Sequence, residues 1–143
     1  MADHKTVGTS VPRGEGGGKV SGQTVYAADV KLSGLLWAKI LRSPHPHARV
    51  RRVDVSRAEK VPGVWAIITG ADVEGCLIGK QIRDMPVLCW DKVRFIGDRV
   101  AAVAAETVDA AEEAIRLIEV DYELLPAVFD PLEAMAPTAP KLH

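Results

Sequence analysis

The stretch Arg42-Ser43-Pro44-His45-Pro46-His47-Ala48-Arg49 separates two apolar runs of this 143-residue chain. Each of its prolines fixes its own φ angle and restricts the preceding residue to extended geometry. The run before it, residues 35–41, contains β-branched and aromatic residues and no breaker, which is typical of a largely buried strand. The run after it, residues 50–55, indicates a second strand with one wetter face. The stretch is therefore a stiff connection between two strands.

His45 and His47 are candidate metal ligands, because side chains two residues apart in extended chain project to the same side. A zinc site needs three or four ligands, and none of the other candidates has ligand spacing. Those candidates are His4, Cys76, Cys89 and His143. The sequence therefore favours hydrogen bonds from these loop histidines to backbone carbonyls, and no metal site is predicted.

The composition is that of one globular domain with a sizeable core. The chain is 48% apolar and its pI is about 6.4, both ordinary values. Two cysteines cannot form a disulfide framework, and their spacing fits no common metal or redox motif, so both are predicted to be reduced, packed thiols. No apolar leader follows Met1, and no run reaches the ~18 apolar residues of a membrane span. These features predict a cytoplasmic protein without a membrane partner.

Charge is distributed unevenly along the chain. Residues 1–60 hold 11 Lys and Arg against 5 Asp and Glu, whereas residues 61–143 hold 7 against 14. The basic side chains include a cluster that could hold an anion or nucleic acid: Arg42, Arg49, Arg51, Arg52 and Arg57. Aromatic residues, which would provide stacking platforms, are not interleaved with it. We therefore interpret the uneven charge as a solvated face of a domain in which the two halves of the sequence interleave in space.

The glycine-rich segment 1–22 suggests a phosphate loop, but the spacing does not match. A P-loop ending at Gly18-Lys19 needs glycine at position 13 and Ser or Thr at position 20, where the chain has Arg13 and Val20. No helix or strand is predicted through so many glycines.

The remaining pattern predicts an α+β fold. Apolar residues at helical spacing indicate one main helix over about 108–118, capped by Thr107 or Asp109. Residues 64–68 are predicted to form a fully buried strand, and residues 100–105 a strand buried on both faces. Strict alternation over 119–124 indicates a half-buried strand. Short helices are predicted near 56–61 and 130–135, the latter capped by Asp130. Strand 100–105, the helix and strand 119–124 would form a β-α-β unit, right-handed if parallel.

Four ordered blocks resemble the a/b hammerhead domain of molybdenum hydroxylase large subunits, the superfamily of xanthine dehydrogenase, aldehyde oxidase and carbon monoxide dehydrogenase. The blocks are Val7-Gly8 through Tyr26-Ala27-Ala28-Asp29, the stretch 42–50, Pro62-Gly63-Val64 with Thr69-Gly70-Ala71-Asp72-Val73, and residues 92–128. Glu15 departs from the usual aspartate, and glycines are added before Lys19. The resemblance implies a hammerhead fold: a mixed sheet packed by the main helix and short helices.

The resemblance also implies an organisation and a role. It divides the chain into a Gly-rich N-terminal segment (1–22), the hammerhead domain (23–135) and a C-terminal connector (136–143). Related enzymes hydroxylate aldehydes or N-heterocycles with a molybdopterin cofactor, and their catalytic segments lie beyond this module. The chain is thus expected to be a non-catalytic N-terminal module or split small subunit, inactive alone, without catalytic, cofactor-binding or metal-binding residues.

The resemblance places the cofactors in partner chains. Molybdopterin is expected in a catalytic subunit, with a [2Fe-2S] cluster and FAD in iron–sulfur and flavin subunits. A free-standing anion- or nucleic-acid-binding module without enzymatic activity is the alternative.

Overall fold

Residues 7–142 are described by a computed structural model. Their contacts divide the chain into two units, which meet at Ser33 and Gly34. The boundaries proposed from the sequence, at residues 22 and 135, stay predictions.

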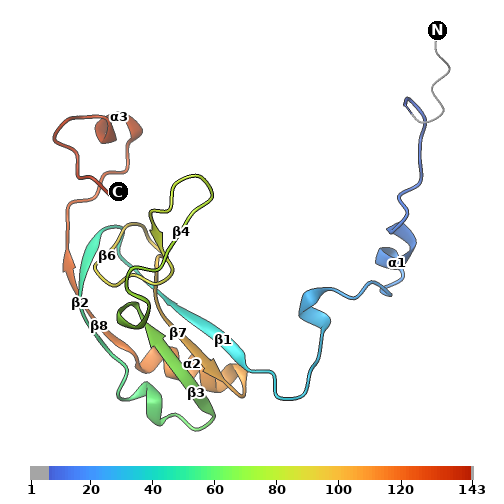
Figure 1. The fold of residues 1–143 in the computed structure, drawn as a ribbon, viewed down its shortest axis with the longest axis horizontal. Helices are drawn as coiled ribbons and strands as arrows, with labels where there is room; N and C mark the ends of the chain where they lie inside the picture. The colour runs from blue at the N-terminus through green and yellow to red at the C-terminus, as the bar shows by residue number, and fades with distance from the viewer. Residues whose placement is uncertain (1–6, 143) are drawn as a thin grey trace. The chain divides into compact units, whose positions relative to one another are not determined.

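The first unit contains two short helical segments, α1 (Gly16–Val20) and the 3-10 helix Ala27–Asp29 (Figure 1). The prediction that no helix forms among the glycines is wrong for α1. The carboxylate of Glu15 stabilises this turn, because its Oε1 lies 2.7 Å from Arg13 Nε and 3.6 Å from Lys19 Nζ. These ion pairs tie the residues before α1 to its last turn.

The second unit contains all eight strands of the described residues (Figure 1). They are β1 (Trp37–Arg42), β2 (Ala48–Asp54), β3 (Val64–Thr69), β4 (Leu77–Ile78), β5 (Met85–Pro86), β6 (Lys92–Val93), β7 (Arg99–Ala105) and β8 (Glu119–Leu124). The α-helices of this second unit are α2 (Val108–Leu117) and α3 (Pro131–Ala134). Its 3-10 helices are Ala58–Lys60 and Gly70–Val73. The α+β class and the main helix are confirmed.

The strands form two three-stranded sheets, ordered β1-β7-β3 and β6-β2-β8, and a small β4-β5 pair. All pairings within the described part of the chain are antiparallel. The structure corrects one detail of the predicted β-α-β unit: β7 and β8 belong to different sheets, so they do not form a parallel pair. The reason is that β8 follows β2 in antiparallel register from Ala48 to Asp54.

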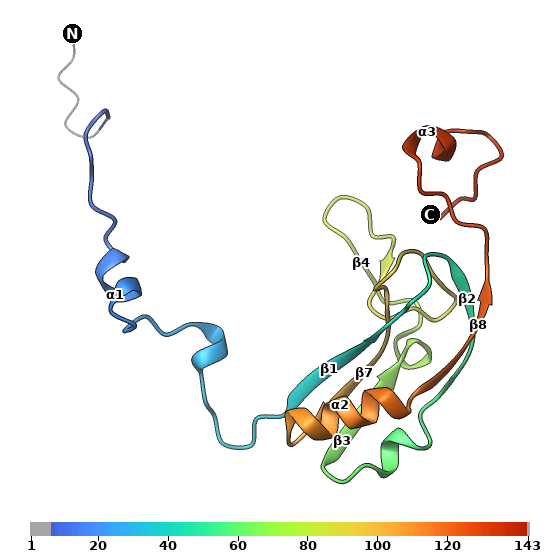
Figure 2. The ribbon, with the colours of Figure 1, turned by 180° about the vertical axis from the view of Figure 1, so that it is seen from behind.

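The core forms where α2 packs on one face of the β1-β7-β3 sheet (Figure 2). Val103 of β7 and Ala111 and Ala114 of α2 are fully or almost fully buried there. A second cluster joins the two sheets through Val100 of β7 and Ala48 of β2. The predicted strand over 100–105 is confirmed, but its burial on both faces is not. Ala102 and Ala104 are only half-buried, because α2 covers the other face of the sheet.

The outer strands β1 and β3 differ from their prediction, since both are substantially exposed. Successive side chains of a strand point to opposite faces of its sheet, and α2 covers only one face. Ile40 of β1 and Ile68 of β3, which lie on the other face, are 40% and 43% exposed. The apolar composition of β1 and β3 predicted that these strands are buried, but no part of the described chain covers their second face.

Thr107 caps α2, which resolves the two candidates proposed from the sequence. Its side-chain oxygen accepts a hydrogen bond from the backbone N–H of Ala110 at 3.1 Å. We expect Thr107→Ala to lower the free energy of unfolding by about 1 kcal/mol in urea denaturation, because a helix N-terminal donor loses its partner. Thr107→Ser keeps the hydroxyl and is expected to retain most of the stability. Equal losses in both variants would contradict the capping role.

Candidate functional site

The connection between β1 and β2 is fastened to the turn before β7 through Ser43. The Ser43 N–H donates to the carbonyl of Asp98 at 2.8 Å, and the Gly97 N–H donates to the carbonyl of Ser43 at 2.8 Å. The Ser43 hydroxyl also accepts from the His45 N–H at 3.0 Å. Two motif blocks that lie about fifty residues apart in the sequence therefore meet in space.

Asp98 stabilises this turn from within. Its side chain is buried, and its two carboxylate oxygens accept hydrogen bonds from the backbone N–H groups of Arg94 at 3.0 Å and Arg99 at 2.9 Å. A buried carboxylate is tolerated when its oxygens are hydrogen-bonded. The Asp98 side chain thus satisfies a backbone donor at each end of the segment 94–99.

His47 fastens the connection to the segment after β8. Its Nδ1 lies 2.6 Å from the carbonyl oxygen of Pro126, so Nδ1 is the protonated nitrogen that donates. The Leu125 N–H donates in return to the carbonyl of His47 at 3.0 Å. The ring is buried, and its Nε2 has no hydrogen-bond partner among residues 7–142. The predicted bond from a loop histidine to a backbone carbonyl is confirmed for His47.

His45 takes a different role. Its ring packs edge-on against Tyr122, with 5.0 Å between ring centroids. Within the described residues, no group of three or more His, Cys, Asp or Glu side chains could hold a metal ion. His4 and His143, the other histidines considered as ligands, lie outside the described part.

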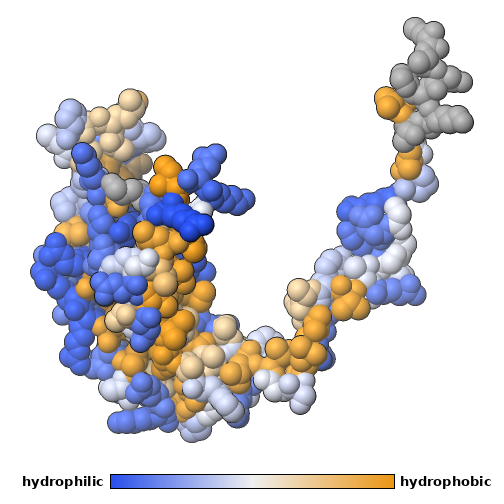
Figure 3. All heavy atoms as spheres, viewed as in Figure 1, coloured by the Kyte–Doolittle hydropathy of each residue, from blue (hydrophilic) through white to orange (hydrophobic). Residues whose placement is uncertain are grey.

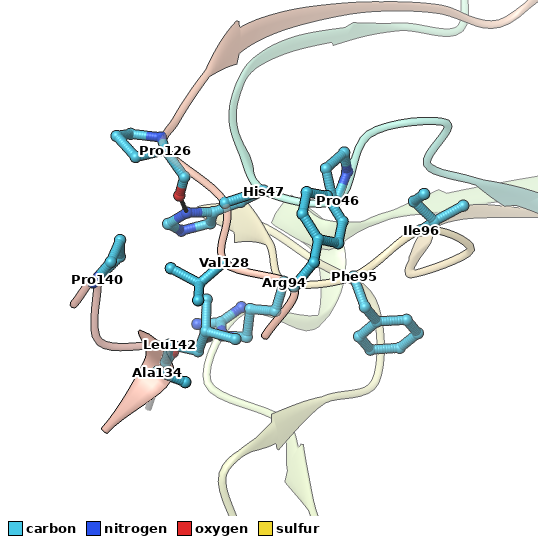
Figure 4. Close-up of a pocket in the computed structure, with 12 residues that line it drawn as sticks. Pro46, His47, Arg94, Phe95, Ile96, Pro126, Val128, Ala134, Pro140 and Leu142 are labelled. Atoms are coloured by element: carbon cyan, nitrogen blue, oxygen red, sulfur yellow. Dashed lines mark hydrogen bonds between the residues drawn. The ribbon is translucent and has the colours of Figure 1, made fainter. Parts of the chain in front are cut away.

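Two motif blocks, 42–50 and 92–128, line a cavity of about 270 Å³ together with residues of the segment 129–142 (Figure 4). Its walls are mostly apolar: Pro46, Phe95, Ile96, Pro126, Val128, Phe129, Ala134, Pro140 and Leu142, with His47 and Arg94 among them. The Arg94 guanidinium is already engaged, since it donates to the carbonyl of Lys92 at 2.8 Å and pairs with Asp91 at 3.2 Å. The cavity is therefore suited to an apolar group rather than to a phosphate.

The arginines of β2 and its neighbours are paired with carboxylates. Arg49 lies 3.7 Å from Glu123 of β8, Arg51 pairs with the same carboxylate, and Arg57 lies 2.9 Å from Glu119. Arg52 pairs with Asp54, and Arg42 donates to the carbonyl of Gly97 at 2.9 Å. The basic and acidic halves of the sequence interleave through β2 and β8, which supports a solvated face over an anion site.

The two cysteines differ in their surroundings. Both are free thiols; Cys89 is buried, as predicted, but Cys76 is exposed. Burial raises the pKa of the Cys89 thiol well above its usual range, and the hydrogen bond and charge of Asp98 raise it further. The prediction of packing was wrong for Cys76 because it lies between the 3-10 helix Gly70–Val73 and β4, where the core does not cover it.

This contrast predicts selective thiol chemistry. At pH 8, we expect a disulfide reagent such as Ellman's reagent to modify one thiol per native chain, Cys76, and both thiols after denaturation, because the thiolate is the reactive form. Cys76→Ser should abolish the fast reaction, and Cys89→Ser should leave it unchanged. Rapid modification of Cys89 in the folded protein would contradict its burial beside Asp98.

The sequence and the fold match one family. Residues 21–126 match the model described as aldehyde oxidase and xanthine dehydrogenase, a/b hammerhead domain. The chain belongs to this hammerhead domain family. It is 46% identical over 132 residues to a probable xanthine dehydrogenase subunit of Bacillus subtilis, a match that covers 92% of this chain and 18% of the relative.

Other relatives agree in sequence and in structure. The carbon monoxide dehydrogenase large chain of Afipia carboxidovorans is 42% identical over 85% of this chain and 16% of its own length. The crystal structure of the Cu,Mo-CO dehydrogenase superimposes with a TM-score of 0.85 and 40% identity, and the match covers 93% of this chain and 17% of that chain. This hammerhead chain thus spans 16–18% of the length of these three proteins.

Sequence reasoning missed one group of surface residues, the apolar side chains of β1 and β3. Trp65 is 69% exposed although it lies in a run predicted to be fully buried. The register shifts between Val64 and Ala66, so Trp65 is the extra residue of a bulge. No periodic signal marks such an insertion, because the whole run is apolar.

Among the described residues no helix is long and apolar enough to span a bilayer.

Proposed function

We propose that this chain is a non-catalytic module of a molybdenum hydroxylase, either an N-terminal module or a split small subunit, and that it frames the large subunit while a partner carries out catalysis. The observation that supports the proposal is the hammerhead match over residues 21–126, combined with the 16–18% share of the relatives' length. The hydrogen bonds around Ser43, Asp98 and His47 fit this role, because they make a rigid support rather than an open reaction site.

The cofactors of such an enzyme do not fit the residues present here. An iron–sulfur cluster needs four thiolates or their equivalents, whereas the chain has two cysteines, of which Cys89 is buried. The cavity beside His47 is apolar and the Arg94 guanidinium is engaged, so nothing there receives the phosphate of a pterin or flavin. Molybdopterin, [2Fe-2S] and FAD are therefore assigned to partner subunits, and the chain alone is proposed to be inactive.

The partners follow from this assignment. We expect a molybdenum-binding catalytic subunit, together with iron–sulfur and flavin subunits, in the cytoplasm and without nucleic acid or a membrane. The residues 136–143 are proposed to be the connector toward the catalytic part. The alternative, a free-standing anion- or nucleic-acid-binding module, would require salt-sensitive binding to random oligonucleotides. The ion pairs of Arg49, Arg51 and Arg57 argue against it.

Native mass spectrometry with metal determination tests the proposed function. The tagged chain is produced in its own host, purified gently, and analysed for mass, molybdenum and iron. We expect a complex with a large molybdenum-bearing chain whose sequence resembles the relatives outside the region matched here. Recovery of a stable, metal-free monomer that ignores such a subunit would overturn the proposal.

A further inference from the structure

The β1-β7-β3 sheet has one covered face and one open face. Register places Ala38 of β1 and Ala66 of β3 on either side of Ala104, and it places Ile40 and Ile68 on either side of Ala102. We call these side chains the outer face: Ala38, Ile40, Ala66, Ile68, Ala102 and Ala104. Figure 3 shows an apolar band over this part of the molecule, seen from the side opposite α2.

The outer face carries no charged side chain, although the opposite face of the same strands does. Lys39, between Ala38 and Ile40, points to α2 and lies 2.7 Å from Glu112. The isoleucines of the outer face nevertheless stay 40% and 43% exposed within the described chain. Strands that are apolar on both sides are typical of sheets buried on both faces, and contiguous exposed apolar patches mark interaction sites.

The shape of the outer face favours close packing of another polypeptide. The central strand β7 contributes only alanines, Ala102 and Ala104, between the isoleucines of the flanking strands. Small side chains allow a partner's backbone or side chains to approach the sheet closely. At the end of the same sheet, Leu35, Leu36 and Trp65 line a shallow pocket of about 340 Å³.

Trp65 is a ready anchor beside the outer face. Its indole Nε1–H donates to a carboxylate oxygen of Glu106 at 3.0 Å, which orients a ring that is 69% exposed. Exposed, oriented aromatic side chains often dominate the binding free energy of an interface. An apolar centre with such an anchor is the composition of a permanent interface rather than of a transient one.

We propose that the outer face, with Trp65 at its edge, is the surface that binds the molybdopterin-bearing remainder of a molybdenum hydroxylase. This inference rests on the proposed function. The occupant is indicated by length. In the three proteins compared above, the region that matches this chain makes up only 16–18% of the polypeptide, so most of each polypeptide is available to cover the sheet. The uncharged outer face suits protein rather than an anionic surface or nucleic acid.

The test uses a double variant, Ile40→Glu with Ile68→Glu, and a matched control, Ile82→Glu with Leu132→Glu. Ile82 and Leu132 are 71% and 78% exposed and lie outside the sheet, so the control adds the same charge away from the outer face. Each tagged full chain is produced in its own host, and the molybdenum-bearing chain recovered with it is identified by mass spectrometry and quantified. Circular dichroism and thermal melting of each purified chain check the fold.

We expect the wild type and the control to recover the molybdenum-bearing chain, and the double variant to recover it at a level lower by a factor on the order of ten or more, because an unpaired buried carboxylate is strongly unfavourable. Equal recovery by the double variant would overturn the outer face as the interface and leave the proposed function standing. Failure of the wild type and the control would overturn the proposed function itself. If the wild-type chain were a homodimer and the double variant a monomer, the outer face would be assigned to a second copy of this chain. That result would also overturn the inference.

Discussion

Gly70→Ala is expected to reduce the free energy of unfolding by about 3 kcal/mol or more, because the added methyl group would overlap backbone atoms. A Cβ at Gly70 would lie 2.1 Å from the carbonyl oxygen of Cys89 and 2.5 Å from its carbonyl carbon. Backbone atoms cannot rotate away as a flexible side chain would. The Cys89 N–H also donates to the carbonyl of Arg99 at 2.8 Å, which holds this backbone in place.

Urea denaturation measured by circular dichroism checks this expectation. Gly75→Ala is the matched control, because Gly75 has open space around its Cβ position and a left-handed φ of +80°. That variant is expected to lose only about 1 kcal/mol, the strain of a side chain in the left-handed region. If Gly70→Ala were no less stable than Gly75→Ala, the close approach between Gly70 and Cys89 would be disproved.

Asp98→Ala is expected to lower the free energy of unfolding by about 2–4 kcal/mol. The substitution leaves two backbone donors, the N–H groups of Arg94 and Arg99, without the carboxylate oxygens that now lie 3.0 Å and 2.9 Å away. Because the Asp98 side chain is buried, water cannot replace both acceptors without opening the turn. The same turn holds Ser43, so the connection between β1 and β2 should loosen with it.

Two comparison variants, measured by thermal and urea unfolding, would separate the loss of these hydrogen-bond acceptors from the loss of a negative charge. Asp98→Asn keeps one oxygen acceptor and is expected to lose less than Asp98→Ala. Asp91→Ala removes the exposed carboxylate that pairs with Arg94 and is expected to change stability by less than about 1 kcal/mol. Hydrogen exchange should accelerate at both the Arg94 and Arg99 amides in Asp98→Ala, at one of them in Asp98→Asn, and at neither in Asp91→Ala. Unchanged exchange there would contradict the capping role.

Much of the local structure could be predicted from the sequence. The apolar stripe of α2, its cap at Thr107 and the cap of α3 at Asp130 depend on residues within a few positions of one another. The stiff connection 42–49 is similarly local, because its prolines restrict the backbone wherever they stand. The His47 bond to a carbonyl was predictable as a kind of contact, since it is the ordinary role of a buried loop histidine.

The partners in these contacts could not be predicted in the same way. That His47 meets Pro126, and that Ser43 meets Gly97 and Asp98, depends on how strands distant in the sequence pair. The separation of β7 and β8 into different sheets is another such outcome. Local patterns of alternation identify a strand, but they contain no information about the sheet it joins.

The sequence by itself determined the main helix, the longer strands, the order of these elements and the family, because helix periodicity, strand alternation, proline geometry and four ordered motif blocks are properties of the chain read locally. Only the tertiary structure decided which apolar side chains are covered. Residues such as Ile40, Trp65 and Ile68 have the composition of a core, yet α2 covers only the other face of their sheet. Hydrophobicity indicates which side chains are more stable when buried, whereas the packing of the folded chain decides which of them the chain itself covers.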